Sequence, residues 1–400
     1  SALALQRYTP FYARSNHVDL WAGSASGLPA TSTGLVVAPV RSDYEGYLLA
    51  DVNGDGYTDL VRGSASGNLL YAGADDGVAS ARMSAFPTIA STTSPTSRVP
   101  LGRCRTADVN RDGRLDLVCF VSPNVAVFTA NAAGGYDAPT LRPLAEIAGS
   151  PYWQSSFLVS DVDGDGYHDA VVTSTYGSDR SATPGPYQYV SVLRGGPSGL
   201  STPFTLPSAP TGAGLCAADL GHTTSYTTGG DFNGDGFGDV AVSHYPPLSS
   251  RVRGVCVQVY FGGLDGLVRA RVTHLADERD TIQGLTPSDV NGDGFTDLLY
   301  VASLTDGSGQ LGLITLRGSA AGVIDDRSAT LRPPFAGWGF YGAYGLGDFN
   351  RDGFGDIVMN IRGGVDAGAP LDDFVLYAGS TTGLPMTPTR DLDYPWTPWM

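Results

Sequence analysis

The sequence predicts an all-β fold, a seven-bladed β-propeller built from four-stranded antiparallel blades. Three observations predict it. An acidic nine-residue motif recurs six times, a glycine-rich hairpin motif recurs seven times, and the 400 residues include 54 Gly and 26 Pro but few stretches with a helical pattern. Units repeated at such a period are typical of propellers and related repeat folds.

The acidic motif reads D-x-[ND]-x-D-G-x-x-D, and its copies start 57, 53, 70, 58 and 59 residues apart. Oxygen donors at positions 1, 3, 5 and 9, with the backbone carbonyl of position 7, suit a hard cation with six or more ligands, which favours Ca²⁺ over Mg²⁺. Glycine at position 6 permits the sharp turn. The sequence therefore predicts six calcium ions. The predicted ligands are Asp51, Asn53, Asp55, Tyr57, Asp59; Asp108, Asn110, Asp112, Arg114, Asp116; Asp161, Asp163, Asp165, Tyr167, Asp169; Asp231, Asn233, Asp235, Phe237, Asp239; Asp289, Asn291, Asp293, Phe295, Asp297; and Asp348, Asn350, Asp352, Phe354, Asp356.

The residues after each motif exclude an EF-hand. Position 12 holds no Glu in any copy, and the residues after position 9 are β-formers such as Leu60-Val61, where an EF-hand needs a helix. The alternative of simple Asx-rich turns does not account for six copies with the same polar positions.

A second motif, G-x-x-x-G-[LV], occurs after each strand that comes after an acidic loop, and it is typical of a tight hairpin. Its copies are Gly23–Leu28, Gly73–Val78, Asn131–Tyr136 (degenerate), Gly195–Leu200, Gly262–Leu267, Gly318–Val323 and Gly379–Leu384. Seven hairpins against six acidic loops predict seven blades, the first without a metal site.

The first blade is predicted to be completed by both ends of the chain. Tyr8–Tyr12 parallels Tyr57–Val61, which puts Pro10 where the ninth-position Asp belongs, and residues 394–400 sit where an inner strand would close the ring. The predicted single domain covers residues 1–400. Its approximate blades are 1–40 with 394–400, 44–90, 100–145, 155–208, 226–276, 283–331 and 342–391.

Charge and composition limit the partners. The formal charge is −16, and the motifs contain 19 of the 40 acidic residues, so the acidity is mainly a supply of metal ligands. All 24 basic residues are Arg and form no cluster that would displace counterions from nucleic acid, so we expect no nucleic-acid partner. No run of 18 apolar residues predicts a membrane span. We expect a monomer.

The four cysteines are Cys104, Cys119, Cys216 and Cys256. Cys104 and Cys119 flank the second acidic loop and could face each other across a hairpin, which would leave Cys216 to pair with Cys256. Three connectivities remain open, as do free thiols. Disulfides and calcium together favour an extracellular or cell-surface location.

The acidic loop between two strands, repeated around a ring, resembles the FG-GAP repeats of the integrin α-subunit propeller and of secreted propellers such as the Psathyrella-type fungal lectins and bacterial repeat proteins. The resemblance covers nearly the whole chain. It implies the propeller fold and calcium at the six loops, but it transfers no ligand-binding residue, since no sugar-binding or integrin-ligand motif matches.

Ligand binding is predicted on the blade face opposite the acidic loops, where the connections between strands are long and irregular. Aromatic side chains near Arg there suit sugar stacking or protein anchoring. The candidates are Trp153, Tyr176, Arg180, His244, Tyr245, Trp338 and Tyr341. The predicted function is a recognition or adhesion module, with a glycan ligand preferred over an extracellular protein.

We expect no enzymatic activity. Ala25 stands at the nucleophile position of the G-x-S-x-G-like segment Gly23–Gly27, and H-E-x-x-H is absent. The alternative is a polysaccharide lyase or hydrolase in which His222 or His244 acts with Tyr226 or Tyr245 as acid and base.

Overall fold

The computed structural model describes residues 2–6, 17–22, 33–36, 47–62, 68–74, 78, 83–86, 101–144, 153–176, 188–206, 223–245, 255–275, 283–304, 310–323, 330–334, 338–363 and 373–392. Within them the chain forms seven antiparallel sheets and divides into two compact units. The fold is therefore all-β, as predicted. No helix in the described part of the chain is long and apolar enough to cross a membrane.

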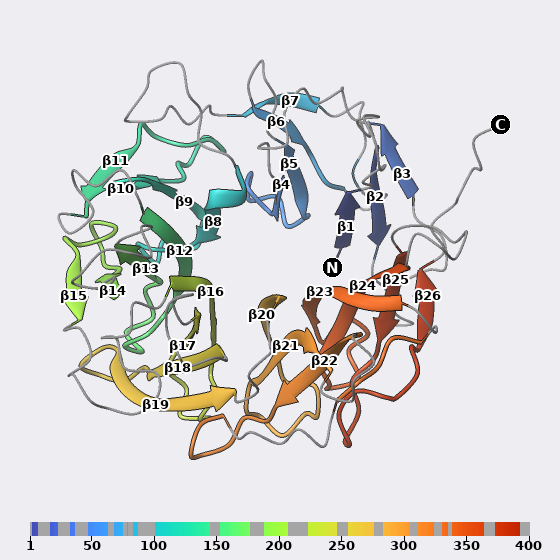
Figure 1. The fold of residues 1–400 in the computed structure, drawn as a ribbon. Helices are drawn as coiled ribbons and strands as arrows, with labels where there is room; N and C mark the ends of the chain where they lie inside the picture. The colour runs from blue at the N-terminus through green and yellow to red at the C-terminus, as the bar shows by residue number, and fades with distance from the viewer. Residues whose placement is uncertain are drawn as a thin grey trace. The chain divides into compact units, whose positions relative to one another are not determined.

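The first unit contains four sheets, in each of which consecutive strands pair with their neighbours (Figure 1). Three have four strands and the first has three. The strands are β1 (Ala2–Gln6), β2 (His17–Ala22), β3 (Thr33–Val36); β4 (Tyr47–Ala50), β5 (Asp59–Arg62), β6 (Asn68–Tyr71), β7 (Met83–Phe86); β8 (Cys104–Ala107), β9 (Asp116–Val121), β10 (Asn124–Phe128), β11 (Thr140–Pro143); and β12 (Trp153–Ser160), β13 (Asp169–Tyr176), β14 (Gln188–Leu193), β15 (Phe204–Leu206). The 3-10 helix η2 (Leu101–Arg103) precedes β8.

The second unit contains three sheets of the same kind. The strands are β16 (Thr223–Gly230), β17 (Asp239–Tyr245), β18 (Val255–Phe261), β19 (Val268–Leu275); β20 (Gln283–Ser288), β21 (Asp297–Ser303), β22 (Leu311–Leu316); and β23 (Trp338–Gly347), β24 (Asp356–Gly363), β25 (Asp373–Tyr377), β26 (Arg390–Leu392). The β20–β22 sheet has three strands, and a single bridge between Leu313 and Leu331 stands where a fourth would pair.

Within each unit, the hydrophobic core lies between consecutive sheets. One cluster joins Val61 of β5 to Leu117 of β9, and another joins Leu299 of β21 to Ile357 of β24. The second strands are covered on both sides, and β9 is buried at every position. This explains why their sequences are continuous apolar runs rather than alternating patterns.

The register of the first sheet corrects one prediction. Ala2 pairs with Ala22 and Leu3 with Trp21, and in the next sheet Leu60 pairs with Tyr71. Since Trp21 and Tyr71 both stand two residues before the hairpin glycine, Ala2 takes the register position of Asp59. The proposed equivalence of Pro10 with the ninth-position Asp is therefore wrong: the strand lies earlier in the chain. Pro10 itself and residues 394–400, the predicted closing strand, lie outside the described residues.

Cys104 lies opposite Cys119 in the β8–β9 pair, with their Cα atoms 4.0 Å apart, and the two form a disulfide. Cys256 lies in β18, while Cys216 lies outside the described residues.

Candidate metal loops and an exposed tyrosine strand

Each acidic loop connects the first and second strands of a sheet, and its ninth residue begins the second strand. The strand pairs that flank the loops end at Ala50↔Asp59, Ala107↔Asp116, Ser160↔Asp169, Gly230↔Asp239, Ser288↔Asp297 and Gly347↔Asp356. The repeated motif is thus placed at the same edge of six sheets.

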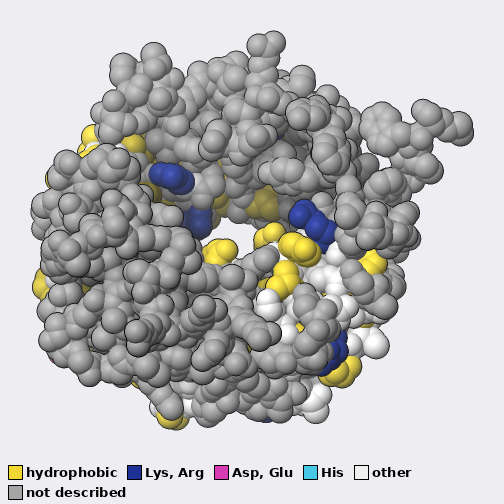
Figure 2. All heavy atoms as spheres, in the orientation of Figure 1, with side chains coloured by type: hydrophobic (Ala, Val, Ile, Leu, Met, Phe, Trp, Pro, Cys, Tyr) yellow, Lys and Arg dark blue, Asp and Glu magenta, His cyan; other side chains and the backbone are white. Residues whose placement is uncertain are grey.

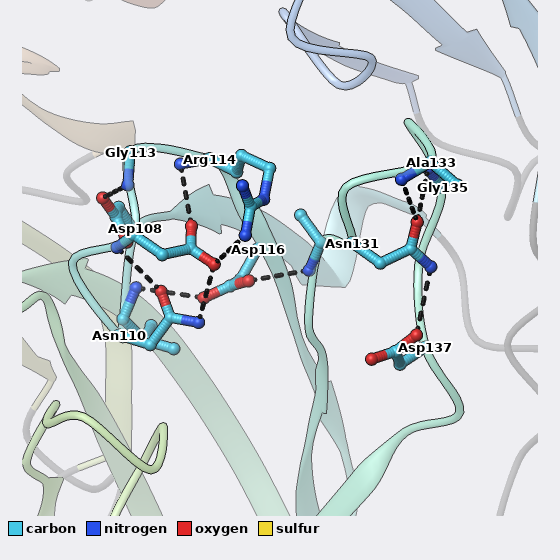
Figure 3. Close-up of polar contacts among 12 residues, drawn as sticks. Asp108, Asn110, Gly113, Arg114, Asp116, Asn131, Ala133, Gly135 and Asp137 are labelled. Atoms are coloured by element: carbon cyan, nitrogen blue, oxygen red, sulfur yellow. Dashed lines mark hydrogen bonds and ion pairs between the residues drawn. The ribbon is translucent and has the colours of Figure 1, made fainter.

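Inside each loop, backbone N–H groups converge on the first aspartate. In the second loop, Asp112 N–H donates to Asp108 Oδ1 at 3.0 Å and Gly113 N–H donates to Oδ2 at 2.9 Å (Figure 3). Asn110 Oδ1 accepts from Asp112 N–H at 3.1 Å. The loop therefore winds tightly around its own carboxylates, and glycine at position 6 has φ between 81° and 93° in all six loops.

The ninth aspartate fastens the loop to the hairpin. Asp239 Oδ2 accepts from Phe232 N–H and Oδ1 from Gly262 N–H, both at 2.8 Å. The equivalent pair of bonds recurs at Asp59, Asp116, Asp169, Asp297 and Asp356. These bonds explain why a hairpin motif accompanies every acidic motif.

The hairpin begins with glycine because the loop backbone lies against it. A Cβ at Gly195 would stand 2.6 Å from the His168 carbonyl oxygen. In the β8–β11 sheet, Ala130 donates the bond to the ninth Asp, so the degenerate hairpin starts one residue earlier than the predicted Asn131. Asn131 instead accepts from Ala133 N–H and Gly135 N–H within the turn (Figure 3).

Burial raises the pKa of the ninth aspartates. The pKa of Asp239 rises to about 7, and the pKa values of Asp169 and Asp297 rise to about 6. The main cause is burial, which disfavours the charged carboxylate, and the neighbouring carboxylates raise these pKa values further. The hydrogen bonds from the two backbone N–H groups lower them. The pKa values of Asp59, Asp116 and Asp356 are raised for the same reason. A cation would relieve this excess of buried negative charge.

The donor set fits calcium. Every side-chain donor at positions 1, 3, 5 and 9 carries oxygen, which hard cations prefer. One side-chain oxygen, Asp163 Oδ1, is buried and has no hydrogen-bond partner within the described chain. One carboxylate oxygen from each of Asp161, Asp163 and Asp169 lies within 4.8 Å of the other two.

Hydrogen bonds join three pairs of successive acidic loops, each pair within one unit. In each pair the N–H of position 8 donates to the carbonyl of position 1 in the preceding loop: Thr296 to Asp231 at 2.7 Å, Gly355 to Asp289 at 2.6 Å and His168 to Asp108 at 3.3 Å. The side chain at position 7 also contacts the preceding loop: the ring of Phe295 lies against Gly234, and that of Phe354 lies against Gly292. The sequence analysis expected only the backbone carbonyl of position 7 to matter. The loops therefore connect neighbouring sheets.

The predicted ligand contacts lie on strands rather than on connecting loops. Trp153 pairs with Tyr176 at the end of the β12–β13 ladder farthest from the acidic loop, and His244 and Tyr245 end β17 at the same edge of their sheet. We call this the loop-distal edge. Arg180 lies outside the described residues. Trp338 is also at this edge, but it is only 9% exposed and packs in the core, so it is withdrawn as a ligand contact.

Tyr341 and Tyr344 of β23 are exposed to 41% and 51%. Each ring lies beside a glycine of its own strand: a Cβ at Gly339 would stand 3.3 Å from Tyr341 Cε2, and one at Gly342 would stand 3.0 Å from the Tyr344 hydroxyl. The Arg362 guanidinium lies 4.8 Å from the centre of the Tyr341 ring. In Figure 2, hydrophobic and Lys or Arg side chains are exposed together in the region where Figure 1 draws β23. The sequence analysis did not identify Arg362, because this residue belongs to no recognisable motif.

Comparison with known proteins gives a family match for part of the chain. Residues 51–119 and 108–172 match the model of the FG-GAP-like repeat. Integrin alpha-V of Gallus gallus is 27% identical over 201 residues, which are 48% of this chain and 18% of that protein. Integrin alpha-3 of Cricetulus griseus is 26% identical over 218 residues, 52% of this chain and 19% of its own length. The chain thus spans about a fifth of these relatives.

Among solved structures, a lectin from Agrocybe aegerita that recognises non-reducing terminal N-acetylglucosamine has a similar fold. The TM-score is 0.56 at 15% identity, and the match covers 95% of this chain and 88% of the lectin.

Proposed function

Because this chain carries FG-GAP-like repeats, we propose that it is an extracellular, calcium-stabilised recognition module whose ligand is a glycan. In this proposal the seven sheets are the blades of one closed ring, and each of the six acidic loops holds one calcium ion. The fold likeness to the lectin supports the propeller, and the oxygen-lined loops support the metal.

The exposed tyrosines of β23 carry the glycan part of the proposal. Sugar rings stack their C–H faces on aromatic side chains, and guanidinium groups donate hydrogen bonds to hydroxyls or carboxylates. Tyr341 and Tyr344 offer two such rings, each beside a glycine of β23, and Arg362 lies beside the first. Trp153, Tyr176, His244 and Tyr245 are further candidates, since they lie at the loop-distal edge of their sheets.

A small platform favours a glycan over a protein. A stable protein interface buries about 800 Å² on each partner, whereas the other exposed large hydrophobic side chains among the described residues lie on separate strands and turns, as at Phe204 and Met386.

A glycan array tests the proposal, with terminal N-acetylglucosamine and uronate-containing oligosaccharides among the probes. Tyr341→Ala and Tyr344→Ala should each weaken binding by about tenfold or more if they are contact residues. Phe204→Ala, 63% exposed on β15, is the matched control and should bind as wild type. Turnover of a uronate-containing polysaccharide would instead identify a lyase, and binding that both tyrosine variants retain would contradict the β23 site.

A further inference from the structure

The third acidic loop, residues 161–169, differs from the other five at position 3. It has Asp163 there, and the other five have Asn. In those five, the Asn Nδ2 donates to Oδ2 of the position 5 Asp at 2.7 to 3.2 Å. Asp163 has no N–H to donate, so the third loop gains a carboxylate and frees Asp165 Oδ2 from that amide bond.

Asp163 is turned into the loop rather than toward solvent. It is 6% exposed, and its Oδ1 is the buried oxygen that lacks a hydrogen-bond partner in the described chain. Oxygens of Asp161, Asp163 and Asp169 lie within 4.8 Å of one another, a grouping found in none of the other described loops. Three negatively charged oxygens this close repel one another unless a cation lies between them.

Two arginines contact the third loop. Arg194 Nε lies 3.4 Å from Asp163 Oδ2, the other oxygen of the carboxylate, and the Arg194 side chain is 47% exposed. Arg111 Nη1 reaches from the second loop and donates to the Asp165 carbonyl at 3.3 Å. Asp163 therefore has one oxygen beside Arg194 and a second oxygen that is buried without a hydrogen-bond partner in the described chain.

We infer that the third loop is the tightest calcium site of this chain, the first to fill and the last to empty. Calcium affinity of oxygen-ligand loops rises with the number of charged ligands and with rigidity. The third loop offers four carboxylates where the others offer three and an amide. This inference rests on the proposed calcium role of the loops.

The test counts sites by calcium affinity. Calorimetric titration of the calcium-free full chain, with competition against a chromophoric chelator for the tight sites, should show one site bound about tenfold or more tightly than the rest. Asp163→Asn gives the third loop the position 3 residue of the other five, so it should fold, and it should remove the tight site. Asn233→Asp is the reciprocal control and should create a second tight site in the fourth loop.

A further variant changes the charge beside the third loop but keeps all of its predicted calcium ligands. Arg194→Gln removes the cation beside Asp163 without removing a ligand, so the third site should bind calcium a few-fold more tightly. If Asp163→Asn leaves the highest affinity unchanged, or if all sites of the wild type are equivalent, the inference is wrong while the calcium proposal stands. If the wild type binds no calcium, the proposed function itself fails.

Discussion

The ninth aspartate of each loop serves more structural roles than any other residue of the motif. Asp239 is fully buried, both its carboxylate oxygens accept backbone N–H groups, and burial raises its pKa to about 7. One side chain thus joins the loop, the second strand and the hairpin, and it is also a predicted calcium ligand. The carboxylates at positions 1 and 5, Asp231 and Asp235, are more exposed and accept hydrogen bonds from within the loop.

Asp239→Asn should therefore be strongly destabilising. The amide nitrogen would face a backbone N–H, leaving a buried donor without an acceptor, and the calcium site would lose a charge. We expect the free energy of unfolding in calcium to fall by about 2 to 4 kcal/mol, measured by urea unfolding. Asp265→Asn, on the exposed hairpin of the same sheet, is the control and should change it by less than about 0.5 kcal/mol. If Asp239→Asn changed the free energy of unfolding as little, Asp239 would not be what joins the loop to the hairpin.

The raised pKa values predict how pH acts on the calcium-free protein. In the folded chain, Asp169, Asp239 and Asp297 hold protons up to about pH 6 or 7, higher than in the unfolded chain. Protonation thus stabilises the folded state, and this contribution is lost as pH rises from about 4 through these values. The urea midpoint of the calcium-free protein should be higher at pH 5.5 than at pH 7.5. Saturating calcium, which needs the deprotonated carboxylates, should abolish or reverse that order; a higher calcium-free midpoint at pH 7.5 would count against this explanation.

At the scale of elements, the loops connect sheets as well as strands. Thr296 N–H donates to the Asp231 carbonyl of the preceding loop, and Asp231 N–H donates in return to Thr296 Oγ1 at 3.0 Å. A cation held by one loop would therefore also fix the edge of the next sheet. The motif alone could not predict this, because position 8 has no fixed residue type and contributes mainly its backbone.

Thr296→Val tests this link by removing the hydroxyl while keeping the shape of the side chain. The Asp231 N–H would lose its partner, so we expect a loss of about 1 to 2 kcal/mol in the free energy of unfolding. Thr296→Ser keeps the hydroxyl and should retain most of that stability. Equal effects of the two substitutions would mean that packing of the methyl group, rather than the hydrogen bond, is what matters.

At the scale of the whole molecule, the sequence predicts best what local chemistry dictates. The six loops were predictable because calcium ligands at fixed spacing leave a direct pattern, and the strands after them because they are continuous apolar runs. The first sheet was misaligned because its sequence lacks that pattern: only the pairing of Ala2 with Ala22 fixes its register. Contacts between sheets, such as those of Arg111 and Phe295, depend on the three-dimensional arrangement and follow no local sequence pattern.

The number of bound metal ions is a consequence of this arrangement. The described first sheet begins at Ala2 in the register of a ninth-position Asp, and alanine offers no ligand. We therefore expect six calcium ions per chain, counted by atomic emission after exhaustive dialysis against dilute calcium. A seventh ion, lost when residues 1–10 are deleted, would contradict the assignment of the first sheet as metal-free.

The central claim is that calcium in the acidic loops stabilises the fold, and thermal unfolding at increasing calcium concentration tests it most directly. Metal bound only to the folded state stabilises it by about 2.7 kcal/mol per site at a hundredfold excess over Kd. With six sites, the Tm at neutral pH should rise by many degrees from the calcium-free protein to millimolar calcium, and it should continue to rise with the logarithm of the calcium concentration. A Tm that is the same in chelator and in calcium would contradict the account.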